Sequence, residues 1–376
     1  MSDLPWAAAR ERARTACAPG PVALVAVNDA LGDTAASDLL ALGLVPHAAT
    51  SAMDGWVVAG EGPWTLDAGS GPLPDGHARV IVTGGVPPEG AESVLPVEHG
   101  AVSGDRLSGP TPPPGRHIRP AGEEARTGDV IVAGGRVLTP ARLAVLATTG
   151  HDEVPVRRAP RVLLLVTGDE LDSTGIPAVG RVRDVMTPML PPMLERLGAR
   201  VVRVERVRDD ASDVAEAAEL EESDLVVSAG GTGRSAADPI GSAWEKLRAD
   251  VRFRGVDMRP GHPASLAVLP DGRPWLALPG NPLAAVVTAL SFVPALVAGH
   301  TGAPLPEASV ATAGASFSGR AGTTLVPAEH GPEGLVPATT SRPHMLRGLA
   351  EADVVAIVPA GGVEPGQAVP VLPRVW

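Results

Sequence analysis

Cysteine, lysine and tyrosine are nearly missing from this chain of 376 residues: Cys17 and Lys246 are the single examples of their types, and tyrosine does not occur. One cysteine cannot form an internal disulfide or supply a metal site that needs several thiolates, so we expect a protein of the reducing cytoplasm. Since lysine is so rare, any cationic group of a binding site is expected to be an arginine or a histidine.

Clustered positive charge is missing too. The formal net charge is -12 and no long basic run occurs, which argues against a nucleic-acid partner because phosphate backbones are bound mainly by lysine and arginine. The nine histidines include no pair at the spacing of helical metal ligands, so no zinc site is expected. No G-x-S-x-G motif supports a Ser-His-Asp hydrolase.

No segment is expected to cross a membrane. Residues 1–14 alternate between apolar and charged types, unlike a signal peptide. Prolines such as Pro191 and Pro192 are expected to interrupt every apolar stretch that would be long enough to span a bilayer.

The length predicts several domains, and the pattern of apolar, glycine and proline residues divides the chain into four parts. Residues 1–43 together with 136–160 are predicted to form a helical and extended domain. Residues 44–135 have the short strands and turns of a β-rich domain. Residues 161–302 have the rhythm of an α/β domain, and residues 303–376 return to short strands, which predicts a small C-terminal β-domain.

The first 160 residues are predicted to contain two helices, a second apolar-periodic run and several short strands. One helix covers Trp6 to Ala16. The other, Leu138 to Thr149, is opened by Thr139 and Pro140, a good cap and first-turn pair. The periodic run of Ala35 to Leu42 is interpreted as part of a helical N-terminal segment. The predicted strands include Ala78 to Thr83 and Asp129 to Val132.

The third part alternates apolar strands with helices, which predicts a doubly wound, mostly parallel sheet. The predicted strands are Val162 to Val166, Val201 to Val207, Leu225 to Ser228, Leu266 to Leu269 and Trp275 to Leu278. The predicted helices are Pro188 to Leu197, Ser212 to Glu222, Ile240 to Ala249 and Pro282 to Ala298.

Polar or glycine-rich loops follow four of these strands, at the sheet edge where such folds bind ligands. The loops are Thr167 to Glu170, Arg208 to Asp210, Gly230 to Gly233 and Pro279 to Pro282. Carboxylates beside glycine turns and helix starts suit a phosphorylated ligand held through Mg²⁺, which takes oxygen ligands. Each loop also has a plainer interpretation as a cap, a tight turn or a helix start.

Eight motifs in a fixed order carry a more specific signal than any one loop. They are Ser51 to Gly55, Val82 to Gly90, Ile118-Arg119 with Gly122 to Glu124, Thr167 to Leu171, Arg208 to Asp210, Ser228 to Gly231 with Asp238, Arg259 to Gly261, and Leu278 to Pro282. In this order they resemble the molybdopterin molybdenumtransferases, the MoeA-type proteins related to the C-terminal domain of gephyrin. The resemblance covers nearly the whole chain.

The resemblance implies an elongated four-part subunit that forms a homodimer, with an active cleft between the α/β domain of one subunit and the β-rich domain of the other. It also implies a reaction in which adenylyl-molybdopterin and molybdate give molybdenum cofactor and AMP, with Mg²⁺. Because the soft ligands of molybdenum are the sulfurs of the substrate itself, the protein needs no cysteine for this chemistry. Pathway or acceptor enzymes would be its protein partners.

The resemblance assigns roles to individual residues. Asp169 and Glu170 would bind the metal. The catalytic candidates are Asp54, Thr83, Glu124, Glu170, Asp209 and Asp238, with the first three reaching the cleft from the partner subunit. The substrate-binding candidates are Gly168, Asp169, Asp184, Gly230, Gly231, Arg254, Arg259, His262, Pro279, Gly280, Asn281 and Pro282.

The chain departs from the family pattern mainly on its basic side, where Arg259 and His262 stand in a segment that usually carries lysines. Arginine presents a planar fork and histidine is partly neutral at pH 7, so neither is equivalent to lysine. Three alternatives therefore stay open: a catalytically impaired molybdopterin-binding paralogue or scaffold, a nucleotidyl- or phosphoryl-transfer enzyme, and a carboxylate-rich hydrolase.

Overall fold

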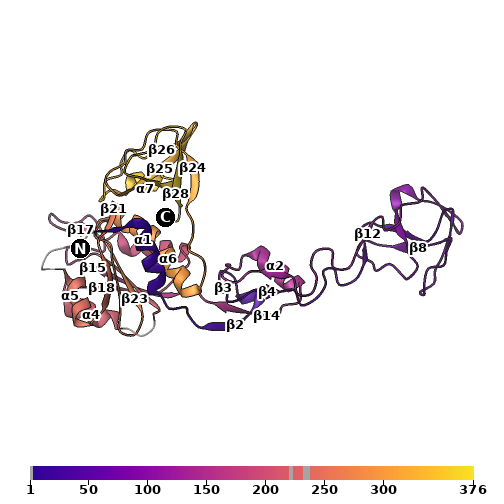
Figure 1. The fold of residues 1–376 in the computed structure, drawn as a ribbon, viewed down its shortest axis with the longest axis horizontal. Coiled ribbons are helices and arrows are strands. Elements are labelled where there is room, and N and C mark those ends of the chain that lie inside the picture. Colours follow the sequence, from indigo (N-terminus) through magenta and orange to yellow (C-terminus); the bar gives the residue numbers. More distant parts are fainter. Residues whose placement is uncertain (1–2, 220–222, 232–237) are drawn as a thin grey trace.

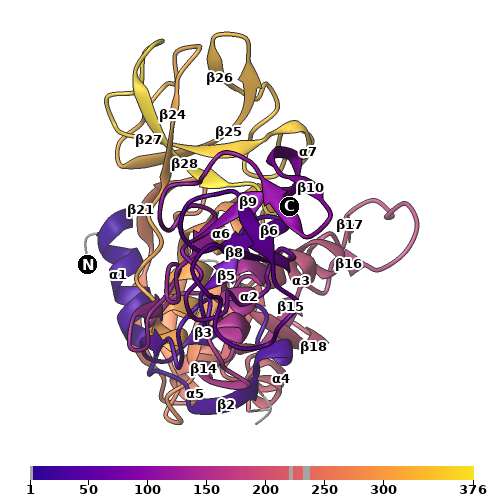
Figure 2. The same ribbon diagram turned by 90° about the vertical axis from the view of Figure 1, so that its right-hand side faces the viewer.

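The computed structural model describes residues 3–219, 223–231 and 238–376. The molecule is long and narrow: a broad body lies at one end, a β-rich module lies at the other, and a slender middle part joins them (Figure 1). Turned by 90°, the C-terminal sheet lies against one side of the body (Figure 2). The predicted multi-domain α/β fold is confirmed, and the four domain boundaries stay a prediction.

The body is built on a six-stranded sheet of order β18-β15-β19-β23-β22-β20. The first four strands are parallel, whereas β22 pairs antiparallel with both of its neighbours. The strands are β15 (Arg161–Thr167), β18 (Arg200–Val207), β19 (Leu225–Ala229), β20 (Asp250–Arg254), β22 (Ser265–Val268) and β23 (Pro274–Leu278). The mostly parallel sheet is thus as predicted. Strand β20 was missed because only Phe253 in it is buried, so it carries no apolar run.

Helices cover both faces of this sheet, and the residues of β15 show how the faces divide. Val162, Leu164 and Val166 pack with α1, α3 and α6, whereas Leu163 and Leu165 pack with α4 and α5. This alternation follows from the two-residue period of a strand, and burial on both sides explains the unbroken apolar run. The helices are α1 (Trp6–Ala16), α3 (Met186–Arg196), α4 (Ala211–Ala218), α5 (Pro239–Lys246) and α6 (Pro282–Thr301).

The predicted helices of this part are present but differ in extent from the observed ones. The helix predicted over 212–222 is α4, which ends at Ala218, and residues 220–222 lie outside the described part of the chain. Pro191 and Pro192 were expected to interrupt an apolar stretch but lie inside α3.

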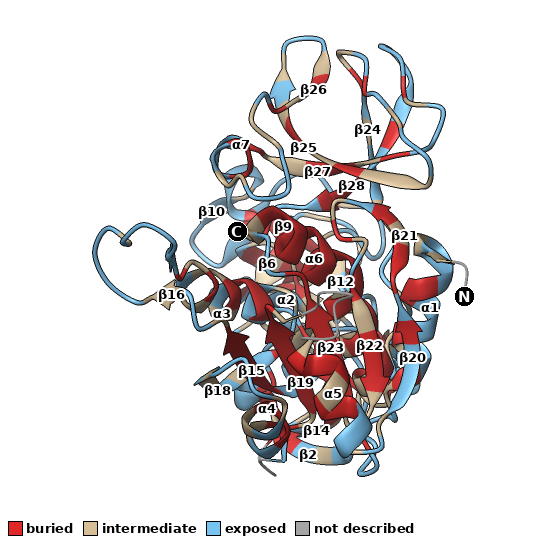
Figure 3. Ribbon diagram, turned by 90° about the vertical axis from the view of Figure 1, so that its left-hand side faces the viewer, coloured by how far each residue is buried: buried red, intermediate tan, exposed pale blue. Residues whose placement is uncertain are grey.

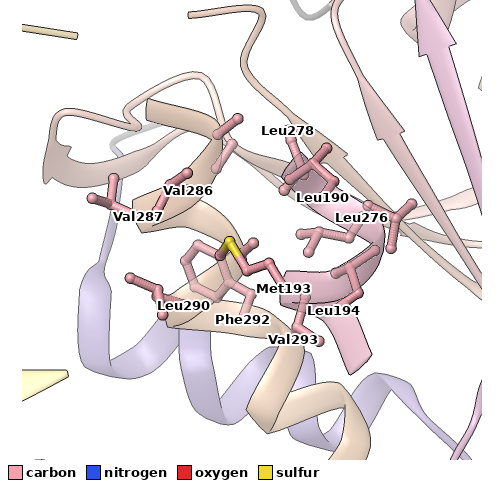
Figure 4. Packing of buried hydrophobic residues seen from close by; sticks show 14 of the residues in the cluster. Leu190, Met193, Leu194, Leu276, Leu278, Val286, Val287, Leu290, Phe292 and Val293 are labelled. Atoms are coloured by element: carbon pink, nitrogen blue, oxygen red, sulfur yellow. The ribbon is translucent and has the colours of Figure 1, made fainter. Parts of the chain in front are cut away.

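Helix α6 is the centre of the larger core (Figure 3). Phe292, Val293 and Leu290 pack against Met193 and Leu194 of α3 (Figure 4). By length and composition α6 could cross a membrane, with a mean hydropathy of 1.9, which corrects the expectation that prolines break every such stretch. Pro294 lies within it, yet 83% of the apolar window is buried inside the protein, so α6 has the burial of a core helix.

The N-terminal residues belong to the body and not to the middle part. Helix α1 packs on α6, where Trp6 Nε1 donates to Ser291 Oγ at 2.9 Å. Just before it, β1 (Leu4–Pro5) pairs with β21 (Val256–Arg259). The buried alanine face of α1 thus finds its partner on α6, whereas the rest of the predicted unit of 1–43 with 136–160 contributes to the middle part.

The middle part pairs segments that lie about 100 residues apart in sequence. Helix α2 (Pro140–Thr148) begins as predicted, with Thr139 Oγ1 accepting from the Arg142 N–H at 3.4 Å. The run of 35–42 is not helical, since Ala35 ends β3 and Leu39 begins β4, and these strands pair with β14 and β13. Short strands here are β2 (Val22–Ala26), β3 (Thr34–Ala35), β4 (Leu39–Leu40), β13 (Val130–Val132) and β14 (Glu153–Arg157).

The β-rich module contains a six-stranded sheet of order β10-β11-β7-β8-β6-β9, beside the pair β5 and β12. Its strands are β5 (Thr50–Ser51), β6 (Gly55–Val58), β7 (Trp64–Leu66), β8 (His77–Ile81), β9 (Ser93–Pro96), β10 (Ala101–Ser103), β11 (Arg106–Ser108) and β12 (Ile118–Arg119). The pair β16 (Leu171–Asp172) and β17 (Val182–Arg183) frames a loop that projects from the body (Figure 2).

The C-terminal sheet has the order β1-β21-β25-β27-β28-β24, with β26 on β25. The sheet therefore includes β1 and β21, two short strands that precede the C-terminal domain in the sequence, and this pairing connects the sheet to the body. The other elements are β24 (Ser309–Thr312), β25 (Thr323–Gly331), β26 (Gly334–Pro337), α7 (Arg347–Glu351), β27 (Val354–Val358) and β28 (Ala368–Pro373).

Candidate active site

A cavity of about 410 Å³ lies at the carboxyl edge of the body sheet, where the loops after β15, β18, β19 and β23 meet. We call it the acidic pocket, after its three carboxylates. Its lining residues are Thr167, Gly168, Glu170, Leu171, Met186, Asp209, Ala229, Gly230, Gly231, Asp238, Pro239 and Gly280. Seven predicted site residues are among them. The remaining part of the predicted glycine loop, Thr232 and Gly233, lies outside the described residues.

Asp169 and Asp209 tie two of these loops together. The Asp169 N–H donates to Asp209 Oδ2 at 3.1 Å, and the Asp209 N–H donates back to Asp169 Oδ1 at 3.4 Å. Arg181 Nη1 also donates to the Asp169 carbonyl oxygen at 3.1 Å. Each carboxylate thus keeps an oxygen that this exchange does not use, beside the pocket that Asp209 lines.

Asp238 caps the start of helix α5 and also lines the acidic pocket. Its Oδ1 accepts from the N–H groups of Ile240 and Gly241 at 3.0 and 3.2 Å, which starts α5. Burial raises the pKa of this carboxyl, although those hydrogen bonds and the charge of Arg254 act in the opposite direction. The Arg254 guanidinium lies over the Trp244 ring, 5.6 Å from its centroid, so this predicted ligand-binding arginine lies outside the pocket lining.

Asp184 was expected at the ligand but its carboxylate is engaged at the start of α3. Oδ1 accepts from the N–H groups of Met186 and Thr187 at 3.0 Å, and Oδ2 accepts from the Thr187 hydroxyl at 2.6 Å. Asp184 is buried and does not line the acidic pocket. Its neighbour Met186 does, and an apolar methionine gives no signal of this in the sequence.

The start of α6 is less open to an anion than the sequence suggests. Gly280 lines the acidic pocket, and the following N–H groups of Leu283 and Ala284 donate to the Pro343 carbonyl at 3.0 and 3.4 Å. A loop of the C-terminal domain thus caps this helix. Of the other predicted positions here, Pro279 is buried, Asn281 is exposed and Pro282 occupies the first turn.

A second cavity, of about 630 Å³, lies at the C-terminal sheet, where β21 pairs with β25. We call it the basic pocket. Its polar lining residues are Arg259, Ser318, Arg320, Thr324, Thr339, Thr340, Ser341 and Arg342. Sequence reasoning found only Arg259, because the other two arginines lie in a region whose motifs were not recognised.

His262 was predicted beside Arg259 at the ligand but lines neither pocket. Its Nε2 lies 2.7 Å from Asp3 Oδ2, at the N-terminal strand that β21 pairs with. The histidine therefore serves a contact between chain segments.

Asp54 and Thr83 lie together in the β-rich module. Asp54 Oδ1 accepts from the Thr83 N–H at 2.6 Å and from the Thr83 hydroxyl at 3.0 Å, and these bonds lower the pKa of Asp54. Glu124 is exposed in a loop, and its backbone N–H donates to the Val45 carbonyl at 2.9 Å. In one chain the whole module lies far from the body (Figure 1), so these residues cannot reach the acidic pocket of their own subunit.

The described residues contain no group of three or more His, Cys, Asp or Glu side chains placed to hold a metal ion. The acidic pocket nevertheless suits Mg²⁺, which commonly binds through one or two carboxylates plus waters and substrate phosphates. Asp169 and Glu170 offer oxygen ligands at its edge, whereas the lone Cys17, whose pKa burial raises to about 12, offers none.

Comparison with known proteins finds two matching family models. Residues 4–150 match the family described as MoeA N-terminal region (domain I and II), and residues 163–298 match the probable molybdopterin binding domain. A solved structure titled molybdopterin biosynthesis moeA protein, from Pyrococcus horikoshii, superposes with a TM-score of 0.83 at 21% identity, covering 99% of this chain and 100% of that one. This likeness confirms the fold.

Curated relatives establish the family. A molybdopterin molybdenumtransferase of Synechococcus elongatus is 32% identical over 292 residues, which is 70% of this chain and 71% of the relative. A molybdopterin molybdenumtransferase of Staphylococcus aureus is 31% identical, with 70% and 68% covered, and molybdopterin molybdenumtransferase 2 of Mycobacterium tuberculosis is 31% identical, with 74% of both covered. The resemblance seen in the eight ordered motifs is confirmed: the chain belongs to the molybdopterin molybdenumtransferase family and is an enzyme of the transferase class.

Proposed function

We propose that this enzyme inserts molybdate into adenylyl-molybdopterin and releases AMP in an Mg²⁺-dependent reaction in the cytoplasm. The observation that carries the proposal is the convergence of Gly168, Gly230, Gly231 and Gly280 with three carboxylates in one pocket. Glycines let a ligand approach the backbone closely, and carboxylates suit a cation that accompanies phosphate.

Asp169 and Glu170 would hold Mg²⁺ in this arrangement. The ion, when bound, would neutralise charge on the phosphate oxygens and hold them in place. Asp209 positions Asp169 through their paired hydrogen bonds, and Asp238 adds a third carboxylate to the lining. Arg254, whose charge opposes the rise in the pKa of Asp238, would limit the negative charge at this end of the pocket.

The basic pocket is the proposed site for molybdate, in line with the role that Arg259 was expected to play. Arg259 is joined there by Arg320 and Arg342, and arginine is suited to bind oxyanions through its planar fork. Five hydroxyl-bearing residues in the lining add neutral donors. The lysines that the sequence lacks are thus replaced by arginines from two domains, and His262 is not needed as a cation.

A homodimer completes the proposed site. Asp54 and Thr83 would reach the acidic pocket from the partner subunit, because their module lies at the opposite end of their own chain (Figure 1). Glu124 belongs to the same module and would approach with them. The product would pass to an acceptor enzyme that uses molybdenum cofactor.

Purified protein, incubated with adenylyl-molybdopterin, tests the proposal directly. AMP release should require both molybdate and Mg²⁺, with AMP measured by chromatography and the product by reconstitution of a molybdenum enzyme. AMP release that does not depend on molybdate would overturn it in favour of a hydrolase. Tight binding without turnover would favour a non-catalytic, molybdopterin-binding role.

A further inference from the structure

Thr167 has a property that separates it from the other polar residues of the acidic pocket. Its side chain is only 4% exposed, and its hydroxyl has no hydrogen-bond partner among the described residues. Thr167 lines the pocket at the end of β15. A buried hydroxyl without a partner costs free energy, so such groups are normally paired with protein, water or ligand.

The glycine pair after β19 makes room for this hydroxyl. A Cβ atom on Gly230 would lie 2.7 Å from Thr167 Oγ1, and one on Gly231 would lie 3.1 Å from it. Both glycines also have positive φ angles, of 99° and 61°. Thr167 Oγ1 therefore lies directly against the glycine turn at which a phosphorylated ligand is expected.

The residue types in the pocket lining limit which chemical groups could accept a hydrogen bond from this hydroxyl. The described lining residues include three carboxylates but no lysine, arginine or histidine. Among these described residues, an anionic group at the glycine turn can be held by the backbone, by a cation on the carboxylates and by neutral donors. Thr167 is the one described lining residue whose side chain is a neutral hydrogen-bond donor.

We propose that Thr167 is a ligand-binding residue whose hydroxyl donates a hydrogen bond to a phosphoryl oxygen held at Gly230 and Gly231. The inference rests on the proposed function, because it takes a phosphorylated ligand for granted. The phosphoryl group belongs either to the nucleotide or to the pterin substrate, and the hydroxyl chemistry is the same for both.

The test compares Thr167→Val with Thr167→Ser in the full-length protein. Affinities for AMP and for molybdopterin are measured separately by calorimetry in Mg²⁺ buffer, together with the melting temperature of each free protein. Valine keeps the shape and removes the donor. It should weaken binding of at least one ligand about 10- to 100-fold, the usual range for a hydrogen bond to a charged group. Serine should restore most of the affinity.

The melting temperatures distinguish ligand binding from a structural role. Valine at 167 should leave the melting temperature unchanged or raise it, because an unpaired buried hydroxyl is removed. Thr288→Val is the matched control in the same domain: Thr288 is fully buried, but its hydroxyl donates to the Ala284 carbonyl at 2.7 Å. That variant should melt earlier and bind both ligands normally.

Wild-type affinity for both ligands in Thr167→Val would overturn the inference. If the melting temperature of that variant were also lowered, the hydroxyl would stabilise the free protein instead. This result leaves the proposed function intact, whereas failure of the wild-type protein to bind AMP and molybdopterin would remove both proposals.

Discussion

The acidic and basic pockets lie on two sides of one element, the start of α6. Gly280 lines the acidic pocket just before the helix, and the Pro343 carbonyl, from the lining of the basic pocket, caps the first turn. Among the described lining residues, the acidic pocket has three carboxylates and no basic side chain. The basic pocket has three arginines and no carboxylate.

This contrast indicates a division of labour within one subunit. An acidic pocket can bind a phosphorylated ligand only together with a cation, while a basic pocket can bind a free oxyanion directly. The two also differ in origin. The described lining of the acidic pocket comes from the body, and that of the basic pocket comes from β21 and the C-terminal domain of the same chain. Only the acidic pocket is proposed to need Asp54 and Thr83 of the partner subunit.

The largest predicted effect tests that difference in origin. Asp54→Ala and Glu170→Ala should each lower turnover about 100-fold or more, the loss typical for a group that stabilises charge during reaction. Mixing the two inactive variants under conditions of subunit exchange should restore about a quarter of wild-type turnover, because half of the dimers then contain one intact site. AMP release measures the recovery.

A second mixture provides the control. Glu170→Ala and Asp209→Ala both damage the acidic pocket of the body, so every active site in their heterodimer carries one defect and no activity should return. Recovery in this mixture, or none in the first, would mean that the site is not divided between subunits as proposed.

A smaller effect is expected when the basic pocket alone is weakened. Arg342→Ala should raise the KM for molybdate about tenfold or more, the range of a charge-assisted hydrogen bond, and change the KM for adenylyl-molybdopterin little. Arg252→Ala is the matched control, since Arg252 is exposed, pairs with Asp250 at 3.1 Å and lines neither pocket. An equal rise in both KM values would contradict separate binding of the two substrates.

Sequence reasoning was most successful where a loop follows a buried parallel strand. Strand β15 could be recognised from its apolar run, and its position placed Gly168 and Glu170 at the carboxyl edge of the sheet, where they line the acidic pocket. Arg320 and Arg342 could not be found in this way. They meet Arg259 because β21 pairs with β25 in the C-terminal sheet, and no local pattern of residues reports such a long-range pairing.

The same reasoning did not foresee contacts that depend on neighbours outside the motif. Asp184 and His262 were assigned to the ligand by their place in a motif. The first caps α3, and the second contacts Asp3 at the N-terminal strand. Thr167 belongs to a recognised motif, but its importance depends on a hydroxyl that has no hydrogen-bond partner within the described part of the chain, and only a three-dimensional structure reveals this.

The smallest predicted effect tests whether the charge of Asp238 in the acidic pocket lowers the free energy of unfolding. Because burial raises the pKa of Asp238, its protonated form is favoured on folding. Its contribution to stability is therefore fully present below the reference pKa of 3.8 and is lost as the pH rises through the higher folded value. Asp238→Asn keeps a cap of similar quality and removes the charge, whereas Asp238→Ala also loses the cap, worth about 1 kcal/mol.

In urea unfolding, the stability of Asp238→Asn relative to wild type should thus increase from pH 3.5 to pH 7, and Asp238→Ala should be less stable than Asp238→Asn at both. Mg²⁺ should stabilise the wild type more than Asp238→Asn at pH 7, because a cation that binds the folded state relieves the repulsion among the carboxylates. A constant difference with pH, together with equal responses to Mg²⁺, would mean that the charge of Asp238 is already balanced by Arg254. The acidic pocket would then not differ from the basic one in needing a counterion.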